Sequence, residues 1–222
     1  MNQRLLVEGQ NDLHVILNLW KVLGLKDVKN YNKRRFPVFA EGKQNIPLKI
    51  AELLSSSDLE NIGIVVDADK STQSTWQSLR FELEKYEFTL LPDVFPIEGL
   101  ILKQAGLPKV GLWIMPDNAH HSTEDVAYLE HFYERIIKPE DKLLQKATEI
   151  VTEISQDNDC RFTKNKFQKA KIHTWLSWQE EPGIAMGFNL RRDDLFDFKN
   201  PIVLNFKIWL ENTFELENGS PQ

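Results

Sequence analysis

Four short apolar runs, each followed by a turn residue and an acid, place the strongest constraint on the fold of this chain. They cover residues 5–7, 36–39, 62–66 and 110–115. The runs do not alternate between apolar and polar residues, which is typical of strands covered on both faces, as in a parallel sheet. We therefore expect a mainly parallel central sheet of about four strands.

Segments of helix length separate these runs. Asn11 can cap a first helix, Pro47 can open a second one that ends near Leu54, and residues 71–86 are long enough for a third. Strands that alternate with helices predict βαβ units, and hence the α/β class with helices flanking the sheet. The irregular stretch 88–102 is a candidate for an extra hairpin at the edge of the sheet.

Helix signals dominate the rest of the chain. They cover residues 123–137, 140–155, 164–179 and 201–213. We accordingly expect an α/β core over residues 1–137. A C-terminal helical extension over residues 138–222 is expected to pack on this core and to form one structural unit with it.

The composition favours a cytoplasmic globular protein. Cys160 is the single cysteine, which fits a reducing compartment, and no apolar run approaches the roughly 18 residues that a membrane span needs. The formal net charge is −6, from 27 basic and 33 acidic residues. A protein that binds duplex DNA by phosphate neutralisation alone is usually basic. A nucleic-acid partner would therefore have to be held by metal ions and local basic patches.

Acidic residues follow the ends of the predicted strands: Glu8, Glu41, Asp67 with Asp69, and Asp117. Ligands of open parallel sheets bind outside the carboxyl ends of the strands, and unpaired carboxylates that meet there repel one another. A hard divalent cation such as Mg²⁺ removes this repulsion, because it prefers carboxylate oxygens. The pattern predicts a metal-dependent site for phosphoryl chemistry, although acids at strand ends also serve as ordinary turn residues.

Two of these segments resemble the Toprim domain. LVEGQND is followed by IGIVVDADK, and the Toprim signature is a glutamate after the first strand and a later Asp-x-Asp. Topoisomerases, bacterial primases, recombination-repair proteins and the overcoming-lysogenization-defect nucleases share this domain, and the VEGxxD form at residues 7–12 is most similar to the nucleases. KVGLWIMPDN, AYLEHF and KIHTWLSWQEEPG resemble small stand-alone Toprim-like proteins of largely uncharacterised function.

The resemblance implies a role for each matching residue. Glu8 would be a general acid/base or a metal ligand, and Asp67 and Asp69 would bind Mg²⁺ or Mn²⁺. The nuclease branch is expected to use a further acid, for which Glu130 is our candidate, with Glu124 and Asp117 as alternates. The other interpretation of Glu130 is a solvated charge on a helix.

A basic partner is expected within a run that contains no acid: Arg161, Lys164, Lys166, Lys169 and Lys171. Lys171 is our catalytic candidate, because it shares a helical face with Phe167 and Trp178 and could meet a phosphate beside a base. Such a lysine also commonly extends past a core without any catalytic role. The Lys33-Arg34-Arg35 segment is a second candidate for phosphate contact, or a solvated loop.

These features favour a Mg²⁺- or Mn²⁺-dependent nuclease acting on DNA or RNA. The sequence contains no GxxxxGK[ST] motif, so any ATPase would act in trans. Two alternatives stay open. One is a non-catalytic Toprim-like regulatory or interaction module, and the other is a metal-dependent phosphatase or nucleotide hydrolase that acts on small substrates.

Overall fold

A five-stranded sheet forms the centre of the protein. The computed structural model describes residues 2–25, 36–119 and 128–216. The strand order is β2-β1-β3-β5-β4, with the first four of these strands parallel and β4 antiparallel to β5. The strands are β1 (Gln3–Val7), β2 (Pro37–Phe39), β3 (Asn61–Asp67), β4 (Leu100–Leu102) and β5 (Lys109–Met115).

The α/β class and the mainly parallel sheet are thus confirmed, and each of the four predicted runs contributes a strand. The difference is β4, which adds a fifth strand at the edge. It lies within the stretch 88–102, where a whole hairpin was expected, and pairs over three residues with β5.

The helices follow the predicted order. They are α1 (Gln10–Val22), α2 (Ile46–Leu54), α3 (Thr72–Glu84), α4 (Leu129–Ile136), α5 (Lys142–Ser155), α6 (Phe167–Ser177), α7 (Met186–Asn189) and α8 (Pro201–Phe214), with 3₁₀ turns η1 (Lys43–Asn45) and η2 (Lys164–Lys166). The single turn α7 was not predicted. Across the described residues, no helix combines the length and the apolar character needed to cross a membrane.

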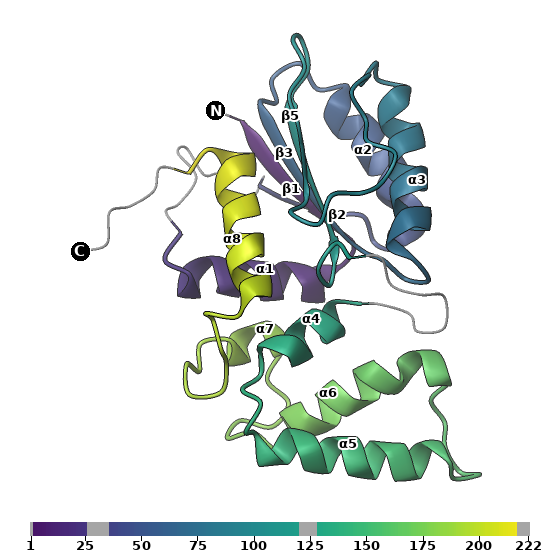
Figure 1. Cartoon of the computed structure of the whole chain (residues 1–222), viewed down its shortest axis with the longest axis vertical. Helices are drawn as coiled ribbons and strands as arrows, with labels where there is room; N and C mark the ends of the chain where they lie inside the picture. The colour runs from purple at the N-terminus through teal and green to yellow at the C-terminus, as the bar shows by residue number, and fades with distance from the viewer. Residues whose placement is uncertain (1, 26–35, 120–127, 217–222) are drawn as a thin grey trace.

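Helices cover both faces of the sheet (Figure 1). Leu6, Ile64 and Leu112 point to the face covered by α2 and α3. Leu5 and Val65 point to the opposite face, where α1 and α8 pack. Because successive strand residues point to opposite faces, burial of both faces explains why the strands are apolar without alternation.

Helix α8 approaches the sheet closely at two paired glycines. Gly63 on β3 lies opposite Gly111 on β5 in the strand register. A Cβ atom added to Gly111 would lie 2.1 Å from Oγ1 of Thr213, and one added to Gly63 would lie 2.5 Å from the Phe214 ring. The absence of side chains at these two positions therefore allows the C-terminal end of α8 to lie against the sheet.

Helices α4, α6 and α5 form a layer beyond the carboxyl ends of the parallel strands (Figure 1). This layer and one face of the sheet share a single buried apolar cluster, which extends from Trp113 on β5 to Trp175 on α6. The residues of the predicted extension therefore pack directly on the sheet. The division between residues 1–137 and 138–222 stays a prediction.

Candidate functional site

A cavity of about 530 Å³ lies at the carboxyl ends of β1 and β3, between the sheet and the C-terminal helices. Its described walls carry six acidic residues, which are Glu8, Asp12, Glu41, Asp67, Asp69 and Glu130. Two lysines, Lys166 and Lys169, line it as well. The three predicted metal ligands and the predicted additional acid therefore border one space.

Glu8 and Asp67 are joined directly. The backbone N–H of Asp67 donates a hydrogen bond of 2.9 Å to Oε1 of Glu8. In turn, Oδ1 of Asp67 accepts a hydrogen bond of 2.9 Å from the backbone N–H of Leu129 at the start of α4. These two bonds fix the ends of β1, β3 and α4 relative to one another.

Three carboxyl groups of the cavity, those of Glu8, Asp12 and Asp67, have raised pKa values. Burial raises the pKa of Glu8 to about 6, and the Asp67 amide and the Lys43 ammonium offset part of this increase. Burial, followed by the negative charges of Glu8 and Asp12, raises the pKa of Asp67 well above its usual range. Burial also raises the pKa of Asp12, although its hydrogen bond from the Gly9 amide acts in the opposite direction. A cation bound here would relieve this repulsion.

Asp69 is held by a lysine that the sequence analysis did not identify. Nζ of Lys43 donates to Oδ2 of Asp69 at 2.6 Å, to the backbone oxygen of Asp67 at 2.8 Å and to Oγ1 of Thr75 at 3.1 Å. Lys43 belongs to η1, just after β2, so its position here depends on the pairing of β2 with β1. No short-range sequence signal could have indicated it.

The two further catalytic candidates lie in different environments. Glu130 is buried at the start of α4, borders the cavity and faces Nζ of Lys169 at 3.4 Å. Lys171 is also buried, but it is not among the described residues that line the cavity. Its Nζ donates to Oε1 of Glu134 at 2.7 Å and lies 5.8 Å from the centre of the Phe167 ring.

Other members of the basic run reach the cavity in place of Lys171. Lys166 and Lys169 line it, and Nζ of Lys166 lies 5.4 Å from the centre of the Tyr128 ring. Tyr128 also borders the cavity and was placed in no site by the sequence analysis. The cavity thus combines a large acidic wall with two lysines and one aromatic ring on the side of the C-terminal helices.

The remaining candidates lie elsewhere or were not placed. Asp117, an alternate acid, forms an ion pair with Arg135 and accepts from the Ala119 amide at 3.1 Å, and it does not border the cavity. The alternate acid Glu124 and the Lys33-Arg34-Arg35 segment lie outside the described residues.

The acidic side chains surround the cavity without forming a closed ligand cage. Within residues 2–25, 36–119 and 128–216, no three His, Cys, Asp or Glu side chains are grouped as they would be around one ion. The donor chemistry nevertheless fits Mg²⁺ or Mn²⁺, because Mg²⁺ is usually bound by one or two carboxylates and keeps several waters. Glu8, Asp67 and Asp69 are the residues that would hold it.

A protein-family model described as "Protein of unknown function (DUF3226)" matches residues 2–215. The chain belongs to the DUF3226 family. The DUF3226 match includes the sheet, the helical layer and every described residue that lines the cavity. No curated protein matches the chain, and no solved structure matches it.

Proposed function

We propose that this DUF3226 protein is a Toprim-type nuclease that hydrolyses phosphodiester bonds of DNA or RNA with Mg²⁺ or Mn²⁺. The observation that supports it most strongly is the Glu8–Asp67 pair. A hydrogen bond of 2.9 Å joins these residues from two adjacent strand ends, in a cavity bordered by six acids. A cytoplasmic location, and any ATPase acting in trans, belong to the same proposal.

A divalent ion held by Glu8, Asp67 and Asp69 would supply positive charge and Lewis acidity toward a phosphate oxygen. Its charge would also offset the burial, and the smaller repulsion between carboxylates, that raise the pKa values of Glu8 and Asp67. The carboxylate oxygens are the ligand type that this class of ion prefers. The protein would then provide an acidic pocket that accepts a negatively charged substrate only together with a cation.

Glu8 is suited to move the proton that hydrolysis requires. The reaction adds one water across a P–O ester bond: the water oxygen bonds to phosphorus, the ester bond breaks, and a proton reaches the leaving oxygen. A general acid/base works best when its pKa lies near the operating pH, and in the metal-free protein burial raises the pKa of Glu8 to about 6. In this role Glu8 would leave the ion to Asp67 and Asp69, because a coordinated carboxylate does not also hold the proton. Lys166 and Lys169, on the side of the C-terminal helices, would attract the phosphates of the substrate.

The direct test is cleavage of single- and double-stranded DNA and RNA by the purified protein with Mn²⁺, with Mg²⁺ and with EDTA. Asp67→Asn keeps a side-chain oxygen for the Leu129 amide but removes the charge. We expect it to lower the cleavage rate about a hundredfold or more. Asp117→Asn is the matched control, because this acid follows β5 and lies outside the cavity.

Other outcomes would contradict the proposal or favour one of the two alternative functions. Cleavage that persists in EDTA, or that survives Asp67→Asn, would contradict the proposal. Stabilisation by Mn²⁺ without cleavage of any nucleic acid would favour a non-catalytic Toprim-like module. Hydrolysis confined to small phosphate esters would favour a phosphatase or nucleotide hydrolase.

A further inference from the structure

A second cavity of about 440 Å³ adjoins the acidic one. Asp69 and Tyr128 border both cavities, so these two residues lie between them. The second cavity is also bordered by Lys43, Lys70, Ser74, Ser78 and Asn165. Its residues come from η1, the loop before α3, one face of α3, and η2.

The two cavities differ in charge. Six acids and two lysines border the first one among the described residues. In the described lining of the second cavity, Asp69 is the one acid, and Lys43 pairs with it at 2.6 Å. Lys70 is exposed and forms no ion pair with an acid of the described residues. The described lining of the second cavity therefore has a surplus of positive charge.

Hydrogen-bond donors accompany this charge. Ser74 and Ser78 are four residues apart, so both hydroxyls lie on the same exposed face of α3. They donate to the backbone oxygens of Ser71 at 2.9 Å and Ser74 at 3.3 Å, and each would have to rotate to donate to a ligand in the cavity. Asn165, on η2, also borders this cavity and adds an amide group to its lining. Ammonium, hydroxyl and amide groups around one open space are the groups that contact phosphate oxygens in protein–nucleic acid interfaces.

We propose that the second cavity binds a phosphate of the nucleic-acid strand whose scissile phosphate lies in the first cavity. The inference rests on the proposed function and adds how the substrate strand runs, from the acidic cavity past Tyr128 to Lys70. The first cavity can accept a phosphate only with a cation, whereas the second cavity needs none. The Tyr128 ring, between the two, offers a surface on which a base can stack.

The test is binding of a fluorescein-labelled single-stranded 12-mer in EDTA, measured by fluorescence anisotropy. Lys70→Glu reverses the charge of an exposed side chain and should leave the fold intact. We expect it to raise the Kd about tenfold and to lower the salt dependence of binding by about one phosphate contact. Ser78→Asp should raise the Kd several-fold, since it places a negative charge in the same cavity.

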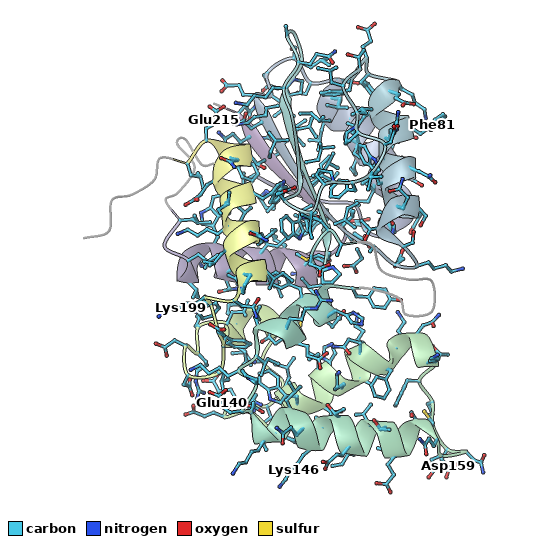
Figure 2. All side chains as sticks on the ribbon, viewed as in Figure 1. Phe81, Glu140, Lys146, Asp159, Lys199 and Glu215 are labelled. Carbon is cyan, nitrogen blue, oxygen red and sulfur yellow. The ribbon has the colours of Figure 1, made fainter. Side chains whose placement is uncertain are left out.

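Lys146→Glu is the matched control, because it makes the same charge change at an exposed lysine of α5. Lys146 lies on the side of α5 that faces away from the sheet (Figure 2). If Lys70→Glu binds the 12-mer as Lys146→Glu does, or if the wild type binds none in EDTA, the inference is overturned. Failure of the nuclease proposal would be a separate result. If the wild type cleaves nothing with Mn²⁺ but Lys70→Glu weakens binding of the 12-mer, the phosphate site is supported and the catalytic proposal is contradicted.

Discussion

The backbone amide of Asp67 donates to the carboxylate of Glu8 at 2.9 Å, and this bond connects the ends of two adjacent parallel strands. The same geometry places two carboxyl groups of raised pKa beside one cavity. Without a cation, their ionisation opposes folding. The state in which both carboxylates are ionised would bind a metal most tightly. In the metal-free protein, that same state destabilises the two strand ends.

Glu8→Gln should stabilise the metal-free protein at neutral pH. The pKa of Glu8 rises from 4.5 to about 6 on folding, so the folded protein holds this proton more tightly than the unfolded chain does. The resulting stabilisation is fully present below pH 4.5 and is lost as the pH rises through about 6. In the wild type the loss amounts to at most about 2 kcal/mol, and Gln, which keeps an oxygen for the Asp67 amide, avoids it.

Urea unfolding in EDTA from pH 4 to pH 8 measures this difference. The variant should be more stable than the wild type at pH 7.5, and the two should converge below pH 4.5. A variant that becomes less stable than the wild type as the pH rises through about 6 would show that the ionised carboxylate of Glu8 contributes favourably, against the burial argument.

Lys43→Met should weaken the metal-free fold and strengthen metal binding. Lys43 ties together Asp67, Asp69 and Thr75, and losing these half-exposed contacts should cost about 1 kcal/mol. Removing the ammonium also removes a positive charge that competes with a cation, so we expect Mn²⁺ to bind about threefold to tenfold more tightly.

Urea unfolding in EDTA measures the effect of Lys43 on the metal-free fold, and calorimetric titration with Mn²⁺ measures its effect on metal binding. Lys49→Met is a suitable control, because that lysine pairs with Glu52 on α2 and does not border either cavity. Weaker Mn²⁺ binding by Lys43→Met would mean that Lys43 positions Asp69 for the metal instead of competing with it.

Lys171→Met should impair stability and not catalysis. Lys171 is buried, and its Nζ pairs with Glu134 at 2.7 Å, so its removal leaves that carboxylate without its ammonium partner. We expect a loss of about 2 kcal/mol in the free energy of unfolding. Lys169→Met removes a lysine of the cavity wall and the partner of the buried Glu130, so it should lower cleavage as well as stability. Loss of cleavage in Lys171→Met but not in Lys169→Met would restore Lys171 as the catalytic lysine.

Gly111→Ala should destabilise the contact between α8 and the sheet. The added Cβ would lie 2.1 Å from Oγ1 and 2.6 Å from Cγ2 of Thr213, so the helix must shift, at a cost of about 1–3 kcal/mol. Thr213→Ala alone should cost little through its hydroxyl, because Oγ1 of Thr213 is buried without a hydrogen-bond partner among the described residues.

Thermal melting of the single variants and the double variant tests this contact. The double variant should recover part of the loss, because two of the three close atoms are gone. If the stability losses of Gly111→Ala and Thr213→Ala are strictly additive, the added Cβ of residue 111 does not act through Thr213, and the structure accommodates it elsewhere.

The sequence was sufficient to predict most of the sheet, because β1, β3 and β5 are buried on both faces and so appear as continuous apolar runs. It was not sufficient for β4 or α7, which have three and four residues. Segments this short carry too little periodicity, and α7 is fixed by its packing against α1.

The carboxylates of the site were predictable because strand ends in a parallel sheet meet at one edge, so Glu8, Asp67 and Asp69 reach a common cavity. The basic residues were not. Lys169 and Lys171 are two positions apart on α6, and at 3.6 residues per turn their side chains point in nearly opposite directions. Which one faces the cavity depends on how α6 packs, and the sequence pattern left that open.

Packed aromatic rings connect the sheet to the helical layer. The ring of Phe206 lies 5.0 Å from Trp113 on β5 and 5.7 Å from Phe132 on α4, and the ring of Tyr133, the next residue along α4, lies 6.1 Å from Trp175 on α6. The part of the structure that carries Lys169 is thus anchored to the part that carries Asp67. The two sides should keep their separation when a ligand enters, so recognition would depend on fit to a rigid, preorganised space and would not require domain closure.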